Sequence, residues 1–500
     1  MTFVITLAGI TGPSYWLDEA ATVSMLRRSM PDFMRTIDHI DLVHATYYLL
    51  MRPWAKVFGH GELALRLPSA VAMALAAGVV ALVGRRCASP SVGLAAGLAF
   101  GASVSISRYG QDARPFAMLT LAVVLASYLF VRMVTARRVW VWTIAYALSL
   151  IAVCLFNLFG LMVVLAHGVT LLWLHRTGGT PFRTLVRWLV TAGATGLVLL
   201  PFAVKANGQS DQVVIKPPEP AVQIWNLFGF LAGHREMIVL VAVIAGIGVA
   251  APVARTVSRP AAPERTAGPT LAMLAAPWLV IPPALLLVAN VFEPIFRPRY
   301  VLFALPALSL LLGAGLVWLA QRGRPLLAGA VAALAVLSLP AHLEVREQAE
   351  RGDDLRLQAD ILREHARPGD AVLYISPTLR WRAEAYPDAF KGLRDVLLDE
   401  TPQQAANFVG VTTHRSGEVR RRLLEGDRVW VMRDRTLDKF PPRDLRWRLR
   451  MLDSTGPYTT VGRWSFAGGS MTLMVRRPAP PAVTPPGDGR TPRPKKTPKP

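Results

Sequence analysis

Two adjacent carboxylates follow the first apolar run of the chain. Asp18 and Glu19 lie in the stretch YWLDEAATVS (15–24), shortly after the apolar residues 2–11. A carboxylate can accept a proton from a reacting hydroxyl group, and acids at membrane depth are often functional. A structural role is equally open, because Asp18 could cap a helix over residues 19–30 that lies on the membrane surface. The two roles can also coexist.

Other charged residues stand where apolar runs begin or end. Asp112, in RYGQDARPF, lies between two arginines, either as an ion pair that sets the loop geometry or as a functional acid. Arg66 stands where the next apolar run begins, and it could extend to the lipid headgroups or bind a lipid phosphate. Arg297 and Arg299, in EPIFRPRYVLFALPAL, could hold a phosphate, because guanidinium groups bind phosphate oxygens in a bidentate manner.

The composition is typical of a polytopic membrane protein. Of the 500 residues 52% are hydrophobic, and the mean hydropathy of +0.36 is high for a soluble enzyme. The two cysteines, Cys87 and Cys154, fall in or beside apolar segments, so the sequence implies no disulfide framework. The net charge of +22 does not indicate nucleic-acid binding, since no recognition helix or zinc spacing accompanies it.

Apolar runs of about the length that spans a bilayer recur through the first two thirds of the chain. Residues 2–11 would add another span, but about ten residues are too short to cross the hydrocarbon core, so either the segment starts upstream or the helix is incomplete. We expect the other spans near 66–84, 91–107, 115–134, 139–156, 158–174, 185–203, 237–253, 270–292, 301–320 and 326–340.

The placement of basic residues predicts the orientation in the membrane. Alternate loops hold 13 arginines, against 7 basic residues in the intervening short loops, and the positive-inside rule makes the first set cytoplasmic. On this topology 11 of the 12 acids in residues 1–340 face outward, together with the loop over 12–65. Outward carboxylates and arginines beside a wide apolar body suit a reaction between a lipid phosphate and a hydroxyl acceptor.

The chain changes character after the predicted membrane domain over residues 1–340. Residues 341–476 are charged, with strand-like runs such as AVLYIS and RVWVM among helical stretches such as 353–366, and they predict a small extracytoplasmic α/β domain. Residues 477–500 are rich in proline and lysine and are expected to be disordered, with contact to the cell wall or to anionic lipid as an alternative.

Four motifs in order, WLDEA, YYLLMRPWAKVFGHGELALRLPSA, SRYGQDARPFAM and RPRYVLFALPAL, resemble those of the polyprenyl-phosphate-sugar-dependent membrane glycosyltransferases. This is the protein O-mannosyltransferase-like, GT-C class, and the match runs through most of residues 1–340. The resemblance implies a GT-C-like helical fold of about 11 transmembrane helices in the plasma membrane, with an outward active site. It also implies transfer of mannose, arabinose or a related sugar from a polyprenyl phosphate with inversion.

The resemblance also assigns roles to single residues. Asp18 matches the catalytic first-loop acid, Glu19 is its supporting neighbour, and Asp112 matches a second-loop acid that is often Glu in the family. Arg114 matches the arginine of the second-loop motif. The candidate residues for binding the donor phosphate or substrate are Arg66, Arg114, Lys205, Arg297, Arg299, Tyr300, Tyr47 and His44.

The resemblance leaves the need for a metal open. Some relatives bind a divalent cation such as Mg²⁺ or Mn²⁺, for which Asp18 and Asp112 would be the ligands. Asn157, in FNLFG, stands where many relatives carry a His before an aromatic residue, so any base or metal role of that His is absent.

We therefore expect transfer of a sugar, mannose before others, to a hydroxyl group of an extracytoplasmic glycan, lipid or protein. Transfer of arabinofuranose or another pentose to a cell-wall polysaccharide is the alternative within the enzyme class. A transporter or flippase of a lipid-linked sugar would more naturally show internal repeats or charged residues inside its spans, where His167 is the main candidate. A third interpretation treats residues 341–476 as a polysaccharide-binding module.

Overall fold

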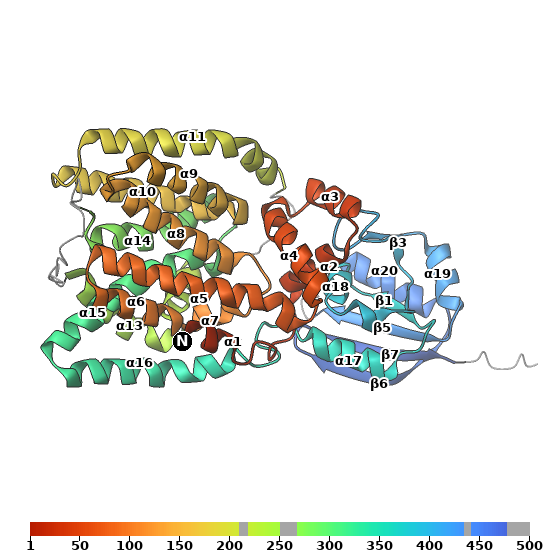
Figure 1. The fold of residues 1–500 in the computed structure, drawn as a ribbon. Coiled ribbons are helices and arrows are strands. Elements are labelled where there is room, and N and C mark those ends of the chain that lie inside the picture. The colour runs from red at the N-terminus through yellow and green to blue at the C-terminus, as the bar shows by residue number, and fades with distance from the viewer. Residues whose placement is uncertain (210–218, 251–267, 435–441, 478–500) are drawn as a thin grey trace, which may run out of the picture.

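A bundle of long apolar helices makes up the first two thirds of the chain (Figure 1). The computed structural model describes residues 1–209, 219–250, 268–434 and 442–477. The proline-rich tail from residue 478 and the arginine-rich loop at 251–267 therefore lie outside the described residues. Within them, eight helices are long and apolar enough to cross a membrane: α5 (Glu62–Cys87), α8 (Phe116–Thr135), α9 (Val139–Phe156), η2 with α10 (Leu158–Arg176), α11 (Phe182–Asn207), α14 (Leu271–Phe292), η5 with α15 (Pro298–Arg322) and α16 (Arg324–Glu344).

Two further spans are bent pairs of helices. One pair is α6 (Pro90–Gly101) with α7 (Val104–Gly110), bent by 61°, and the other is α12 (Pro220–Ala232) with η4–α13 (Arg235–Ala250), bent by 76°. The span expected at 91–107 is thus broken, and the sequence analysis missed α12. The described residues therefore contain up to 10 spans. The eleventh expected span, at residues 2–11, is absent from this count because these residues form only the six-residue helix α1 (Thr2–Leu7).

The exposure of the helices separates the centre of the bundle from its lipid-facing edges. In η5 with α15, 89% of the most apolar window is buried, whereas the values are 17% in α11 and 11% in α16. These two exposed helices lie at opposite edges of the bundle (Figure 1). Glycines bring α13 and α15 close together, because a Cβ at Gly315 would lie 2.1 Å from the carbonyl oxygen of Ile244.

Four short helices lie between α1 and α5: α2 (Leu17–Arg27), α3 (Met30–His39), η1 (Leu42–His44) and α4 (Ala45–Phe58). The expectation that Asp18 caps a helix over 19–30 is wrong, because α2 begins at Leu17 and its N-cap is Trp16. The helix is also not free on a membrane surface. Val23 and Leu26 are buried in the same apolar cluster as Phe408 of the C-terminal region, and α2 contacts α18 (Thr378–Ala383).

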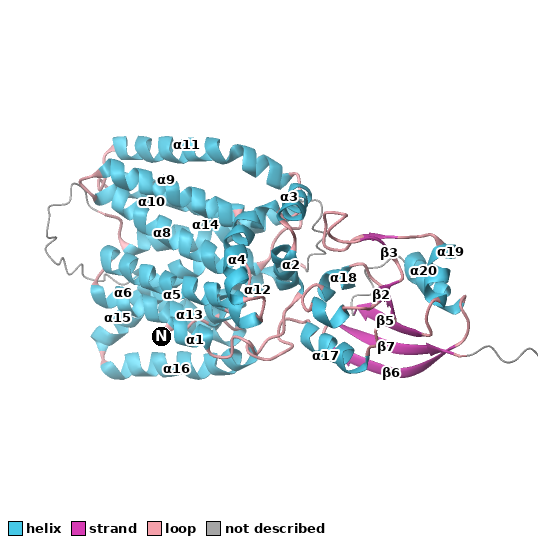
Figure 2. Cartoon of the chain, turned by 45° about the vertical axis from the view of Figure 1, so that its right-hand side comes forward, coloured by secondary structure: helices cyan, strands magenta, loops and turns pink. Residues whose placement is uncertain are grey.

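The C-terminal region has a five-stranded sheet between two layers of helices (Figure 2). The strand order is β2-β1-β5-β7-β6, with β1 parallel to both β2 and β5 and with the remaining pairs antiparallel. The strands are β1 (Ala371–Tyr374), β2 (Arg394–Asp395), β5 (Arg428–Asp434), β6 (Tyr458–Phe466) and β7 (Gly469–Arg476); β3 (Leu398–Glu400) and β4 (Val411–Thr412) pair separately. The helices are α17 (Leu355–His365), α18, η6 (Pro387–Phe390), α19 (Ser416–Leu424) and α20 (Pro442–Asp453).

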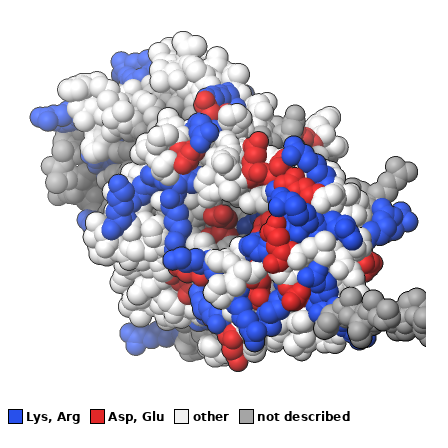
Figure 3. All heavy atoms as spheres, turned by 90° about the vertical axis from the view of Figure 1, so that its right-hand side faces the viewer, with Lys and Arg blue, Asp and Glu red and all other residues white. Residues whose placement is uncertain are grey.

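Side chains of β1 alternate between the two helical layers, as the period of a strand requires. Val372 packs in a cluster with α17 and α18, whereas Leu373 packs in a cluster with α19 and α20. Burial on both faces explains why AVLYIS and RVWVM are continuous apolar runs rather than alternating ones. Acidic and basic side chains are interspersed on the face of the molecule formed by this region (Figure 3), so this face is not a uniform basic surface for nucleic acid.

Candidate active site

Asp18 and Arg299 form an ion pair that solvent reaches. The Oδ2 atom of Asp18 lies 2.8 Å from the Nη2 atom of Arg299, and their side chains are 18% and 21% exposed. Asp18 comes from the first turn of α2, whereas Arg299 comes from η5 at the start of the most buried span. The Arg299 guanidinium carbon lies 5.2 Å from the centre of the Trp16 ring and 5.5 Å from that of Tyr300. The structure thus brings together the first-loop acid and the late arginine.

Arg114 holds the first loop against the start of α2. It donates hydrogen bonds to the carbonyl oxygen of Asp18 at 3.2 Å and to the hydroxyl oxygen of Tyr48 at 2.9 Å, and it lies 3.3 Å from the ring nitrogens of His44. Both Tyr48 and His44 bind the Asp41 carboxylate in turn. Burial would raise the pKa of Asp41, but His44 and Arg114 outweigh it and hold that pKa at about 2. Arg114 and His44 therefore organise the loop.

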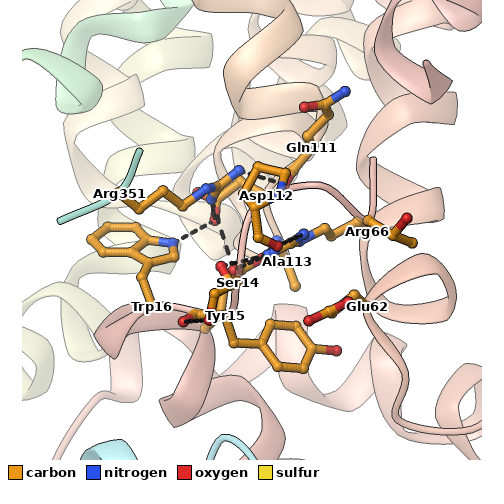
Figure 4. Close-up of polar contacts among 12 residues, drawn as sticks. Ser14, Tyr15, Trp16, Glu62, Arg66, Gln111, Asp112, Ala113 and Arg351 are labelled. Atoms are coloured by element: carbon orange, nitrogen blue, oxygen red, sulfur yellow. Dashed lines mark hydrogen bonds and ion pairs between the residues drawn. The ribbon is translucent and has the colours of Figure 1, made fainter. Parts of the chain in front are cut away.

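Asp112 does not share an open cavity with Asp18. Its side chain is 1% exposed and accepts hydrogen bonds from the Trp16 indole N–H at 3.0 Å and from Arg351 at 2.8 Å (Figure 4). Burial raises the pKa of the Asp112 carboxyl, and although Arg351 opposes this shift, the charge of Glu19 adds to it. The interpretation of Asp112 as a functional acid that contacts substrate is wrong in this conformation, because Trp16 and Arg351 bind its Oδ1 atom and the side chain is 1% exposed.

Glu19 and Arg66 form a second ion pair that is wholly internal. Both side chains are 0% exposed, and the Arg66 Nη2 atom lies 2.7 Å from the Glu19 Oε2 atom. Arg66 also donates to the carbonyl oxygens of Ile10, Pro13 and Ser14, which brings its hydrogen bonds to five. Arg66 has no N–H group left for a phosphate. Its expected roles in binding donor phosphate or extending to the headgroups are therefore wrong.

Glu19 is a structural residue for the same reason. Its Oε1 atom accepts the backbone N–H of Ala113 at 2.8 Å, in addition to its bonds with Arg66. Burial would raise the pKa of Glu19, but the charges of Arg66 and Arg351 outweigh that effect and hold the pKa below its ordinary value. A buried and ionised carboxylate with no exposed surface does not contact a substrate, so Glu19 is not a catalytic residue in this conformation.

The remaining predicted site residues are Tyr300, Tyr47, Lys205 and Arg297. Tyr300 packs against Phe159, with 5.1 Å between the ring centres, and Tyr47 is fully buried in α4. Lys205 instead pairs with Asp38, and the two side chains are 52% and 64% exposed. Lys205 thus ties the end of α11 to α3, while Arg297 is half-buried two residues before Arg299.

Asn157 has a local structural role. Its Oδ1 atom accepts the backbone N–H of Phe159 at 2.9 Å and so caps η2, the turn that places Phe159 against Tyr300. His167 is fully buried; it lies within hydrogen-bonding distance of Ser127 and Tyr146 and stacks on the ring of Phe130. This environment is typical of a satisfied structural histidine rather than of a transport relay.

The residues present do not fit a bound divalent cation. Asp18 is paired with Arg299, and Asp112 is paired with Arg351. Across the described ranges, no group of three or more His, Cys, Asp or Glu side chains is placed to hold a metal ion.

A separate cavity of about 430 Å³ lies between the first loop and the C-terminal region. Its charged lining residues pair with one another, as in Arg356 with Glu62 at 2.7 Å and Arg363 with Asp360 at 2.6 Å. Asp18 and Arg299 are not among the lining residues, so this cavity is distinct from the site around their ion pair.

Comparison with known proteins found a family match to part of the chain and solved structures of similar fold. Residues 46–204 match the family described as dolichyl-phosphate-mannose-protein mannosyltransferase. ArnT from Cupriavidus metallidurans in the apo state has the same fold, with a TM-score of 0.56 at 14% identity over 94% of this chain and 96% of that one. The same protein bound to undecaprenyl phosphate gives a TM-score of 0.55 at 14% identity, with the same coverage. The chain thus shares the fold of ArnT over most of its length, and the family match covers residues 46–204.

Both residues of the accessible ion pair lie outside the matched family segment, because Asp18 precedes residue 46 and Arg299 follows residue 204. No curated protein matches the sequence at a significant level. The oligosaccharyltransferase of Archaeoglobus fulgidus gives a TM-score of only 0.44 at 12% identity, over 94% of this chain and 74% of that one. The match to ArnT over 94% of this chain therefore shows the shared fold, and at 14% identity it assigns no role to a single residue.

Sequence reasoning missed Arg351, which binds Asp112 directly. The only signal in the sequence is a series of arginines at 346, 351 and 356, five residues apart, in the stretch that follows the last apolar run. That spacing predicts no partner, since Asp112 and Glu62, the acids that Arg351 and Arg356 bind, lie 239 and 294 positions away in the chain. Folding alone brings Arg351 to Asp112.

Replacing Arg66 should destabilise the protein more than replacing any exposed arginine. In Arg66→Met the ionised Glu19 stays buried without its partner, which costs about 3–5 kcal/mol. Thermal unfolding in detergent measures the loss, with Arg35→Met as the control because Arg35 pairs only with the nearby Asp32 and is 55% exposed. The double variant Arg66→Met/Glu19→Gln should recover part of the stability. An unchanged melting temperature for Arg66→Met would refute a structural role of the pair.

The first loop should lose stability in acid because of Asp41. Its pKa is lowered from 3.8 to about 2 on folding, so its contribution is complete above the unfolded value and is lost as the pH falls from about 4 to about 2. The difference in melting temperature between the wild type and Asp41→Asn should therefore shrink across that window. A difference that stays constant from pH 5 to pH 2 would contradict the assignment.

Proposed function

We propose that this protein is a GT-C glycosyltransferase that moves a sugar from a polyprenyl phosphate to a hydroxyl acceptor on the outer side of the membrane. The observation that carries the proposal is the accessible Asp18–Arg299 pair, which joins a carboxylate and a cation beside aromatic rings at the mouth of an apolar bundle. A protein of the same fold has been solved with undecaprenyl phosphate bound. The positive-inside asymmetry of the loops supports the outward orientation.

In the proposed reaction Arg299 exchanges partners. The ion pair holds the Arg299 guanidinium next to the Asp18 carboxylate. When the donor binds, the donor phosphate replaces the Asp18 carboxylate at the Arg299 guanidinium, in the bidentate geometry that suits these groups. Asp18 is then free to accept a proton. The aromatic rings of Trp16 and Tyr300 restrict where the guanidinium can move.

The chemical step is an inverting displacement at the anomeric carbon. The acceptor oxygen forms a bond to that carbon as the bond between the carbon and the phosphate oxygen breaks, and the acceptor proton moves to Asp18. The departing polyprenyl phosphate keeps the electron pair of the broken bond, and Arg299 stabilises its charge. The transition state resembles an oxocarbenium ion, which a nearby carboxylate also stabilises.

We propose mannose as the sugar, because the family that matches residues 46–204 is described as using dolichyl-phosphate mannose. A pentose such as arabinofuranose is the alternative, with a cell-envelope glycan, lipid or protein as the acceptor. Incubating the purified protein with radiolabelled polyprenyl-phosphate mannose and polyprenyl-phosphate arabinofuranose, each with these acceptors, distinguishes the alternatives. Movement of intact donor across proteoliposomes without transfer would identify a flippase instead.

Asp18→Asn should abolish transfer without abolishing donor binding. Loss of a general base costs roughly 100- to 10,000-fold in rate, whereas Arg299 is left available to the phosphate. Initial rates and binding of the labelled donor measure the two effects. Asp38→Asn is the matched control, since Asp38 is an acid of the same loop that is 64% exposed. Wild-type transfer by a correctly inserted Asp18→Asn protein would remove Asp18 from the mechanism.

Arg299→Ala should weaken donor binding more than acceptor binding. Hydrogen bonds to a charged group contribute about 1.5–3 kcal/mol, so the donor Kd should rise by roughly 10- to 150-fold. Arg35→Ala is the control, because it removes an arginine whose ion-pair partner is the nearby Asp32 of the same helix. Equal donor affinity in Arg299→Ala and the wild type would exclude Arg299 as a phosphate ligand.

A further inference from the structure

The short stretch between the last apolar helix and the C-terminal region lies against the beginning of the chain. Residues 345–354, called here the connecting segment, run from the end of α16 to the start of α17. The backbone N–H of Ser14 donates to the carbonyl oxygen of Gln348 at 2.9 Å. Arg346 donates to the carbonyl oxygens of Ala8 at 2.9 Å and Ile5 at 2.8 Å. The six-residue helix α1 is therefore held by the connecting segment as well as by the bundle.

Arg351 of this segment reaches the interior of the site. Its side chain is 3% exposed and donates to the Asp112 carboxylate at 2.8 Å and to the carbonyl oxygen of Gln111 at 2.6 Å. Its Nη1 atom also lies 3.8 Å from Glu19. Two buried carboxylates thus face this one cation, while Arg66 compensates only Glu19 directly. Arg351 supplies the positive charge that Asp112 requires for burial.

The contact with Asp112 extends to the Asp18–Arg299 pair through Trp16. The Asp112 Oδ1 atom that binds Arg351 also accepts the Trp16 indole N–H at 3.0 Å. The ring of Trp16 in turn lies beside the Arg299 guanidinium. Trp16 is the N-cap residue of α2 and precedes Asp18 by two positions. The orientation of this ring therefore depends on an acid that Arg351 holds in place.

Asp353, two residues after Arg351 in the connecting segment, contacts the start of α2. Its Oδ2 atom accepts the backbone N–H of Leu17, the first residue of α2, at 3.3 Å. The helix has no side-chain cap from its own N-cap residue, and a carboxylate at this end is favourable for its backbone donors and its dipole. Asp353 is paired with Arg382 of α18, which also pairs with Asp434 of β5. The C-terminal region thus caps the helix that carries Asp18.

We propose that Arg351 and Asp353 are positioning residues for the transfer reaction. They hold the first turn of α2 and the Trp16 ring so that Asp18 and Arg299 meet donor and acceptor in one geometry, which makes the C-terminal region part of the active-site support. The inference rests on the proposed role of Asp18. Misplacement of a catalytic group by about 1 Å can cost about 100-fold in rate, so the effect should be large in kcat.

The test compares Arg351→Met with Arg363→Met. The control removes an arginine of α17 whose pair with Asp360 leaves both side chains about half exposed, at 48% and 56%. Arg351→Met should lower kcat by about 10- to 100-fold while the donor KM changes little, because Arg299, the proposed phosphate ligand, remains. Arg351→Lys should recover part of kcat, since it restores the charge beside Asp112 but not the second hydrogen bond to Gln111.

Hydrogen exchange measured by mass spectrometry provides a readout that does not depend on activity. Amides of residues 17–27 should exchange faster in Arg351→Met and in Asp353→Ala, whereas Asp353→Asn should stay close to the wild type because Asn also caps helices. The exchange of the sheet strands β1 and β5 should not change in any of these variants. Faster exchange in the sheet strands as well as in α2 would instead indicate general loss of stability and would overturn the proposal.

A double-mutant cycle tests whether Arg351 acts through Asp112. Arg351→Met leaves a buried carboxylate without its cation, so Arg351→Met/Asp112→Asn should exchange more slowly in α2 than Arg351→Met alone. The double variant also keeps the test available if Arg351→Met does not fold. Additive effects, or wild-type kcat and exchange in a folded Arg351→Met, would overturn the proposal. Activity of Asp18→Asn would instead refute the proposed function, without changing the exchange result.

Discussion

The buried ion pair between Glu19 and Arg66 is the interaction on which the rest of the site depends. Neither side chain is exposed, and removing such charges from water is costly unless the hydrogen bonds are complete. Arg66 meets this condition by binding Glu19 and the carbonyl oxygens of Ile10, Pro13 and Ser14. Glu19 also accepts the N–H of Ala113. One pair thus fixes the first loop, the start of α5 and the loop before α8 relative to one another.

Two neighbouring acids have different roles because of the geometry of a helix. Successive residues of an α-helix point about 100° apart, so within the first turn of α2 one carboxylate can face the interior while the next faces a solvent-accessible cleft. Glu19 is the internal one and Asp18 the accessible one, at 0% and 18% exposure of the side chain. The internal acid orients the helix, and the proposed chemistry belongs to its neighbour.

The C-terminal region takes part in this arrangement rather than lying apart from it. The connecting segment binds the chain start through Arg346, the second-loop acid through Arg351 and the first turn of α2 through Asp353. The contact with Asp112 matters most for stability, because this carboxylate is 1% exposed and would be costly to leave unpaired. The short helix α1 is likewise held from two sides, because Gln111 and Arg346 donate hydrogen bonds to its backbone.

The sequence alone determined most of the apolar spans and the α/β character of the C-terminal region, because hydropathy and strand period are local signals. The resemblance of its motifs placed Asp18 and Arg299 in one candidate site without predicting their ion pair. It missed α12 and the break between α6 and α7, since a bend leaves the hydropathy of a run unchanged. Only the tertiary structure decided that Arg66 binds Glu19 instead of lipid phosphate, and that Asp112 is covered by Trp16 and Arg351. Those choices depend on burial and on contacts between residues more than 45 positions apart, and the type of a residue does not reveal which partner satisfies it inside the fold.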